Sequence, residues 1–251
     1  MKKFICLFIL LSFYTKNLAQ TDDFSKPDYA AIEKNVADKK SPYFYKTLFD
    51  RYTLSDSTMT IEEKRHLYYG YSFQDEYSPY ASSDAEDELR EILMKDEAEA
   101  DDFNKIIILT DKIQQQYPFS LRIKEYRVYC FKELGHTEAA SKEYAQAAII
   151  IDAILSSGEG TSKENCFYVI KASNEYEIIN LLGFEFGGRQ SLIEHRYDHL
   201  TVLENPYGIE GFYLTDLFRF EPELHDMMHK SIEMGRAFII KEYQQKPMPL
   251  F

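Results

Sequence analysis

Histidines supply the most concentrated reactive chemistry in this sequence. Four of the six histidines lie between residues 195 and 229, where His195 pairs with His199 and His225 pairs with His229. A spacing of four residues puts two imidazoles on one face of a helix, and also on one face of a strand because side chains alternate along a strand. Neutral imidazole is a common metal ligand, so the two pairs are candidate metal sites.

The second pair, His225 and His229, lies in the segment HDMMH, which is similar to the HExxH motif of zinc hydrolases. Asp226 replaces the glutamate that acts as the base, and its shorter side chain would have to reach a metal-bound water. Glu194, Asp198 or Glu223 could serve as a further ligand. The alternative is that both pairs lie on polar surfaces and bind nothing.

Other catalytic and cofactor motifs are missing from the sequence. It contains no GxSxG elbow, no P-loop, no GxGxxG after a predicted strand, no EF-hand loop and no CxxC pair. We therefore expect no cofactor and favour a non-catalytic protein. A metal-dependent hydrolase of the cell envelope that uses the C-terminal histidines is the alternative function.

Tyrosines are the candidates for binding a partner. Tyr77 and Tyr80 lie in a predicted loop, where exposed tyrosines favour interfaces. Tyr126 and Tyr144 lie on two predicted helices of the central region. These four residues predict a surface for a protein or peptide. A structural subunit of a surface assembly is a third function that is compatible with them.

Residues 1–20 have the three parts of a secretory signal peptide. Lys2 and Lys3 are followed by the apolar run FICLFILLSFY and then by the small residue Ala19. This order predicts export to the periplasm or the outside of the cell, with cleavage after Ala19 or Gln20. The apolar run is shorter than the roughly 20 residues that span a bilayer, and no later segment is long and apolar enough.

Net charge excludes one class of partner. The chain has 42 acidic and 29 basic residues, which give a formal net charge of −13. Loss of residues 1–19 removes three lysines and no acid, and moves this charge to −16. Such a protein repels phosphate backbones, so we expect no nucleic acid partner.

Cys130 and Cys166 are the two cysteines that remain after cleavage. Two cysteines in an exported protein can form a disulfide but are no disulfide framework. Cys130 lies between Tyr129 and Phe131, a setting typical of a core. Buried free thiols are therefore the expected state, and a bridge between the two cysteines is the alternative.

Apolar spacing and capping residues predict that residues 21–157 form a helical region. Thr60 and Glu63 form a capping box, and apolar residues recur at helical intervals along the central segments. The predicted helices cover residues 28–40, 43–52, 60–73, 83–95, 102–117, 121–134 and 137–155. The apolar stripe that we expect to be the buried face of the last helix consists of Ala140, Tyr144, Ala147, Ala148, Ile151 and Leu155.

Residues 87–153 resemble two degenerate tetratricopeptide repeats, which need small residues where two helices approach closely. The residues that match the second half of a repeat are Leu134, Gly135, Ala140, Tyr144 and Ala147. Lys124 and Val128 depart from the pattern, because the repeat prefers Trp and Gly there. An ordinary antiparallel helical bundle is the alternative, and both arrangements predict paired antiparallel helices.

Residues 158–251 predict a smaller α+β region that packs on the helices as one domain. The run CFYVIK at 166–171 is β-rich, residues 174–182 predict a helix, and the glycines at 183–188 predict a turn. Two aromatic strands, about 195–203 and 209–218, flank the turn signal NPYG and predict a hairpin. We expect a last helix over residues 223–243.

The order of these segments resembles a family of exported Bacteroidetes proteins that is defined by a domain of unknown function. The resemblance rests on the segment SPYFYKTLFDRY, the central helices, and the runs YVIKASNEYEIINLLG, SLIEHRYDHLTV and GFYLTDLFRF. It implies an exported protein with a helical-plus-β layout, and it implies no activity. Together with the patterns above, it predicts a mostly helical α+β fold. Antiparallel helix pairs should precede a small antiparallel hairpin or sheet and a C-terminal helix.

Overall fold

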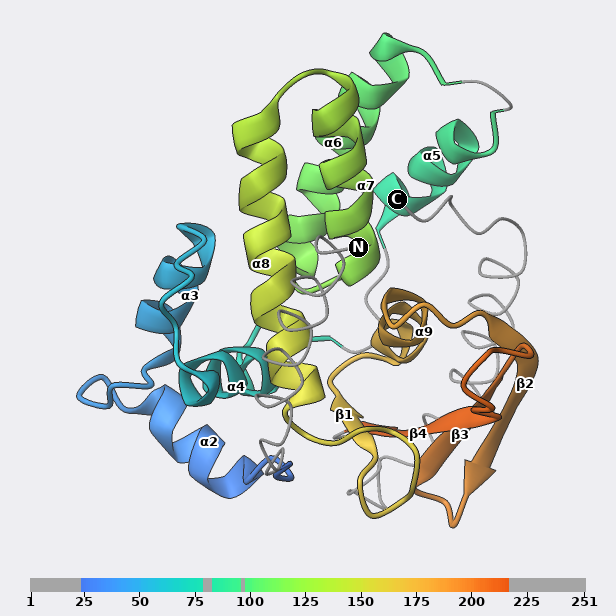
Figure 1. Cartoon of the computed structure of the whole chain (residues 1–251). Helices are drawn as coiled ribbons and strands as arrows, with labels where there is room; N and C mark the ends of the chain where they lie inside the picture. The colour runs from blue at the N-terminus through green and yellow to red at the C-terminus, as the bar shows by residue number, and fades with distance from the viewer. Residues whose placement is uncertain (1–23, 79–82, 96–97, 217–251) are drawn as a thin grey trace, which may run out of the picture.

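The computed structural model describes residues 24–78, 83–95 and 98–216 (Figure 1). Four predicted features lie outside these residues: the signal peptide, Tyr80, the histidine pair of His225 and His229, and the last helix. Along the described chain, helices come first and a sheet follows. The predicted fold class, α+β and mostly helical, is therefore confirmed.

The N-terminal helices are α2 (Tyr29–Ala37), α3 (Tyr45–Thr53) and α4 (Ile61–Gly70), followed by a short 3-10 turn, Tyr71–Phe73. The predicted capping box opens α4. The Thr60 hydroxyl accepts the N–H of Glu63, and the Glu63 carboxylate accepts the N–H of Thr60 at 2.7 Å. Two backbone donors that the helix itself cannot satisfy thereby gain partners.

The central helices are α5 (Asp84–Leu93), α6 (Ala100–Gln116), α7 (Leu121–Glu133) and α8 (Thr137–Leu155). Each helix packs against the next, as the predicted helix pairs require. The longest of them, α8, reaches from the tips of α6 and α7 down to the level of the sheet (Figure 1). It therefore contacts α7 of the central helices and also the N-terminal helices α3 and α4.

The buried face of α8 is not the predicted apolar stripe. Tyr144 is 67% exposed, and most of the remaining stripe is only half-buried. The buried residues are Ala140, Glu143, Ile149, Ile150, Ala153 and Ile154. The helix is rotated relative to the prediction because a carboxylate, Glu143, lies in the interface with α7.

Glu143 is tolerated there because two cations of α7 surround it. Its two carboxylate oxygens lie 2.9 Å from Lys124 Nζ and 2.6 Å from Arg127 Nε, and all three residues are buried. Burial alone would raise the pKa of Glu143, but the charges and hydrogen bonds of Lys124 and Arg127 outweigh burial and lower it. The cluster is paired within the protein and has a structural role.

Within the described residues, four strands form one mixed sheet in the order β1-β4-β3-β2. The strands are β1 (Phe167–Val169), β2 (Phe186–Ile193), β3 (Tyr197–Val202) and β4 (Gly211–Asp216), and α9 (Ala172–Leu181) lies between β1 and β2 in the chain. β3 pairs antiparallel with both β2 and β4, whereas β1 runs parallel to β4. The predicted hairpin corresponds to β3 and β4.

Strand β2 begins inside the glycine segment that predicted a turn. Gly188 has φ +85°, and the register with β3 shifts between Phe186 and Gln190. Gly187 passes close to β3, since an added Cβ would lie 2.9 Å from Thr201 Oγ1. The glycines therefore form a bulge within a strand, where the left-handed region and a close approach both favour residues without a side chain.

The buried apolar residues of the described chain form two separate hydrophobic cores. The main core joins α2–α4 to the sheet and α9, and includes Ile32, Leu67, Phe167 and Leu214. The helical core lies among α5, α6 and α7 and includes Leu89 and Ile113. The main core therefore draws on both of the predicted regions, 21–157 and 158–251.

A buried hydrogen-bond network connects α4, α7 and α9. The hydroxyls of Tyr68 and Tyr117 donate to Asn174 Oδ1 at 2.8 and 2.6 Å, and Asn174 Nδ2 donates to Glu177 at 2.7 Å. The Glu177 carboxylate also accepts the Ser120 hydroxyl and the N–H of Leu121, both at 2.9 Å. An anionic side chain thus caps the first turn of α7 from α9.

Candidate functional site

Exposed apolar side chains gather where α9 ends and where β3 turns into β4. Nine large hydrophobic residues are exposed in the described part of the chain, and four of them lie in these two short segments. The four are Leu181, Leu182, Leu203 and Tyr207, and the half-buried Phe184 lies between them. We refer to these five residues as the surface patch.

The end of α9 brings the first half of the surface patch to the second. Gly183 has φ +84°, and the N–H groups of Gly183 and Phe184 donate to Asn180 O and Ile179 O at 2.9 and 3.1 Å. This is the Schellman arrangement that ends many helices. It turns Phe184 back toward the sheet, where its ring lies 5.0 Å from Phe212 and 6.0 Å from Tyr207.

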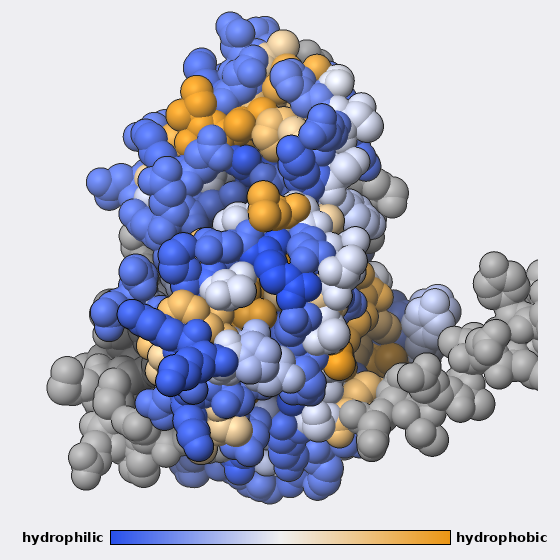
Figure 2. Space-filling view, turned by 90° about the vertical axis from the view of Figure 1, so that its left-hand side faces the viewer, coloured by the Kyte–Doolittle hydropathy of each residue, from blue (hydrophilic) through white to orange (hydrophobic). Residues whose placement is uncertain are grey.

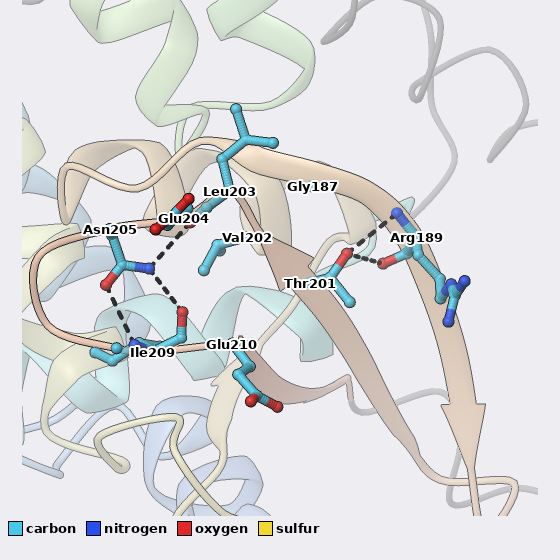
Figure 3. A pocket seen from close by; sticks show the side chains of 10 residues that line it. Gly187, Arg189, Thr201, Val202, Leu203, Glu204, Asn205, Ile209 and Glu210 are labelled. Atoms are coloured by element: carbon cyan, nitrogen blue, oxygen red, sulfur yellow. Dashed lines mark hydrogen bonds between the residues drawn. The ribbon is translucent and has the colours of Figure 1, made fainter.

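Asn205 holds the second half in a fixed loop. Its Oδ1 accepts the N–H groups of Tyr207 and Ile209 at 3.1 and 3.2 Å, while its Nδ2 donates to Leu203 O and Ile209 O at 3.0 and 2.6 Å. Figure 3 shows the bonds to Leu203 and Ile209. These bonds close the loop at its base and leave Tyr207 78% exposed at its tip. The loop therefore presents an aromatic side chain on an ordered backbone.

An open hollow of about 560 Å³ adjoins the surface patch. Leu203 and Ile209 line it on the loop side, and Gly187 and Val202 line it on the strand side. Figure 3 shows the hollow where β2 bends away from β3, with the Arg189 side chain pointing away from it. The bulge creates this space, because Thr201 Oγ1 bonds the backbone N and O of Arg189 where a regular ladder would bring the backbones together.

Three exposed carboxylates surround the hollow and the surface patch. Glu185 precedes β2, and Glu204 and Glu210 flank the β3–β4 loop. None of the three makes an ion pair with another described residue. We call them the acidic rim. Arg189, on the strand side, also belongs to the lining of the hollow, so the site combines apolar contact area with side chains of both charges.

The first predicted histidine pair does not lie on one strand face. His195 is exposed in the β2–β3 turn, with φ +54°, whereas His199 is half-buried on β3 with its ring 4.5 Å from Tyr213. A turn interrupts the alternation on which the spacing argument depends. In the described residues, no group of three or more His, Cys, Asp or Glu side chains has the geometry of a metal site.

The second predicted histidine pair is not tested by this structure. His225 and His229 both follow Asp216, the last described residue of β4, so their positions relative to His195 and His199 are not described. Metal binding by His225 and His229 therefore stays a prediction. Metal binding that involves His195 or His199 together with residues after Asp216 likewise stays a prediction.

The predicted binding tyrosines are dispersed. Tyr77 packs against the main core and donates its hydroxyl to Ile170 O, and Tyr126 packs against the helical core. Tyr144 is exposed on α8, on a different part of the molecule from the surface patch. The described structure does not bring these three tyrosines together, and their role in binding stays a prediction.

The sequence contains one signal for the surface patch. The segment NPYG predicts a turn, and a tyrosine at the tip of a hairpin turn is exposed by geometry. Hydrophobic periodicity does not indicate that the end of α9 lies beside that turn. This contact between the two segments depends on Gly183 and on the register of β2 against β3.

Both remaining cysteines are buried free thiols, Cys130 in the helical core and Cys166 in the main core. Burial raises the pKa of the Cys130 thiol to about 11 and raises that of Cys166. The expected free state is thus observed. Among the described helices, none has the length and apolar character needed to cross a bilayer.

Comparison with known proteins places the chain in a family. No curated protein and no solved structure matches it. A family model with the description "Domain of unknown function (DUF4919)" matches residues 30–228, which is most of the chain. The match covers every described strand and, apart from Tyr29, every described helix. It confirms the expected membership of a family that is defined by a domain of unknown function. The chain therefore belongs to the family of the domain of unknown function DUF4919.

Proposed function

We propose that this protein is a non-catalytic interaction module that binds a protein or peptide through the surface patch. The observation that carries the proposal is the exposure of Leu181, Leu182, Leu203 and Tyr207 at the end of α9 and in the β3–β4 loop. Of these residues, Leu203 also lines the open hollow. Single exposed hydrophobic residues are common on soluble proteins, whereas a contiguous group beside a hollow is typical of interaction sites.

The ordered structure of the β3–β4 loop favours a binding role for its exposed tyrosine, Tyr207. Asn205 makes four hydrogen bonds that order the loop before any partner arrives. A preordered loop loses little conformational entropy on binding, so more of the contact energy appears as affinity. An aromatic residue at its tip is also the residue type that contributes most at protein interfaces.

The face on the α3 side of the molecule supplies a control surface. It is mainly hydrophilic, and its hydrophobic areas are small and separated (Figure 2). Leu54 follows α3 and is 80% exposed, which is close to the exposure of Tyr207. A substitution there removes a comparable apolar side chain at a distance from the surface patch.

The test is crosslinking capture from envelope extracts with tagged protein that begins at Thr21. A central interface tyrosine contributes about 2 kcal/mol or more, so the double variant Leu203→Ser/Tyr207→Ser should lose the crosslinked partner by about tenfold or more. Leu54→Ser should retain it. Equal capture by both variants, or no partner above an unrelated acidic protein, would contradict the proposed function.

The identity of the captured chain separates two forms of the proposal. A different protein or peptide supports an interaction module. A second copy of the same chain, held through Leu203 and Tyr207, would instead support a structural subunit of a surface assembly. Mass spectrometry of the crosslinked residues distinguishes the two.

We also propose that the protein is exported and that residues 1–19 or 1–20 are removed. The charged start, the apolar run and the small residue Ala19 support this proposal. The intact mass of the protein from fractionated cells should correspond to a chain that begins at Gln20 or Thr21. A chain in the cytoplasmic fraction that retains Met1 to Ala19 would contradict it.

A further inference from the structure

Arg65 on α4 is a buried cation whose guanidinium faces the start of the described chain. The residue is 5% exposed. Its Nη2 donates to the backbone oxygens of Ser25 and Lys26 at 2.8 and 3.1 Å, and its Nη1 donates to the hydroxyl and the backbone oxygen of Ser156 at 2.7 and 3.3 Å. Its Nε lies 3.5 Å from a Glu62 carboxylate oxygen. Each nitrogen of the guanidinium therefore faces an acceptor.

The segment that Arg65 binds is held at further points. The N–H of Ser25 donates to the backbone oxygen of Ser156, the C-cap of α8, at 3.1 Å, and Pro27 is buried. The next residue is the N-cap of α2. We refer to residues 25–27 as the N-terminal strap. The strap joins the start of α2 to α4 and to the end of α8.

The hydrogen bonds of Arg65 favour the docked position of the strap. The first residues of a domain are poorly ordered unless they are tied down. Release of the strap would take the carbonyl acceptors of Ser25 and Lys26 away from a buried cation, which costs more than the loss of a neutral hydrogen bond. Arg65 also lies at the C-terminal end of α8, where the helix dipole favours a cation. The strap is therefore a fixed part of the fold.

The strap begins close to the predicted end of the signal peptide. Cleavage after Ala19 leaves residues 20–24 before Ser25, and cleavage after Gln20 leaves residues 21–24. Even when fully extended, so short a segment spans at most about 13 to 18 Å. A peptidase has to fit the chain on both sides of the scissile bond into its active site, and proteolysis is concentrated in exposed, loosely held segments. The docked strap therefore holds the predicted cleavage site close to the folded protein.

We propose that docking of the strap onto Arg65 blocks removal of the signal peptide, so that cleavage has to precede the folding of the main core around α4. The bond is cut while residues 25–27 are still free, and the strap docks when α4 and α8 pack. A precursor that folds first keeps its apolar run. This inference rests on the export proposal, because it concerns the order of cleavage and folding in an exported chain.

The test is cleavage of the purified, folded precursor, residues 1–251, by purified signal peptidase in detergent. The matched variant carries about eight flexible Gly and Ser residues inserted after Asp23, which move the cleavage site away from an unchanged strap. The folded wild type should be cut at least about tenfold more slowly than this spacer variant, because its strap has to open first. The same insertion after Phe251 is the control and should leave the wild-type rate unchanged.

Arg65→Lys tests the hydrogen bonds of the strap directly. Lysine keeps the charge but lacks the planar fork that binds the strap and the end of α8 together. This variant should be cut about tenfold faster than the wild type, because its strap is open more often. Arg90→Lys, on α5, is the control and should be cut at the wild-type rate. Near-ultraviolet circular dichroism of the tyrosines verifies that each precursor is folded.

Two results would contradict the proposal, and they have different meanings. If the folded wild type is cut as fast as the spacer variant, the strap does not set the order of cleavage and folding, while the export proposal stands. If the peptidase cuts none of the precursors, the export proposal itself is contradicted and the proposed order fails with it.

Discussion

At the scale of single residues, buried charge determines how the helices face one another. Glu143 lies between Lys124 and Arg127, and its presence in the interface rotates α8 away from the stripe that its apolar residues predict. A prediction from the spacing of apolar residues places every glutamate on the exposed face of a helix. It cannot indicate that two cations one helical turn apart on α7 will surround a carboxylate.

Replacement of Glu143 should be strongly destabilising and dependent on pH. Glu143→Gln leaves the buried Lys124 without a counterion and leaves Arg127 with Asp111 alone, which costs about 3 kcal/mol at neutral pH. The pKa of Glu143 is lowered in the folded protein, so its contribution is present above its ordinary value of 4.5 and is lost as pH falls through the folded pKa.

Urea unfolding of the wild type and Glu143→Gln at pH 7, 5 and 4 measures this effect. The difference in unfolding free energy should be largest at pH 7 and should shrink at the lowest pH. Glu138→Gln, on the exposed side of the same helix, is the matched control and should change stability little. A difference that stays constant with pH would show that Glu143 is not the titrating group.

At the scale of elements, local signals indicate the helices better than the sheet. The capping box of Thr60 and Glu63 and the apolar spacing of α6 depend on residues within one or two turns, so sequence alone indicates them. The parallel pairing of β1 with β4 joins residues 167–169 to residues 214–216 and has no local signature. The bulge of β2 cannot be predicted from its glycines, because Gly187-Gly188 is equally typical of a turn.

The β2–β3 turn is built from residues that fit it poorly. Glu194 and His195 both have φ +54°, and Arg196 N–H donates to Ile193 O at 3.1 Å. Two consecutive left-handed residues favour Asn-Gly, and other residues there cost of order 1 kcal/mol each. Glu194→Asn/His195→Gly should therefore raise the free energy of unfolding by about 1–2 kcal/mol.

The urea midpoint of this double variant measures the gain. Glu194 also pairs with Lys163, and both side chains of that pair are exposed enough that Lys163→Ala should have little effect. Lys163→Ala is therefore the control for the lost ion pair. A double variant that is less stable than the wild type would show that the native turn residues make contacts that outweigh their backbone cost.

At the scale of the whole molecule, the two cores are coupled. α8 packs along α7 beside the helical core and places Ile150 and Ala153 in the main core. Glu177 on α9 bonds Ser120 and Leu121 at the start of α7, which adds a polar connection between the cores. We therefore expect the described helices and sheet to unfold as one cooperative unit.

The two thiols report on the two cores in one experiment. In protein that begins at Thr21, Cys130 and Cys166 are the only cysteines, and burial with a raised pKa makes both unreactive in the folded state. Brief thiol labelling at increasing urea, read by intact mass, should show molecules with no label or with two. A population with a single label at intermediate urea would show that one core unfolds before the other.

The composition of the main core has a consequence for biosynthesis. Ile32, Leu48 and Leu67 leave the ribosome long before Phe167 and Leu214, the residues that complete their packing. The N-terminal helices therefore cannot complete their packing until the residues of the sheet are synthesised. Contacts between residues so far apart in the chain also form slowly. If the chain is exported as proposed above, the same delay would keep its N-terminal helices unfolded during most of the passage across the membrane.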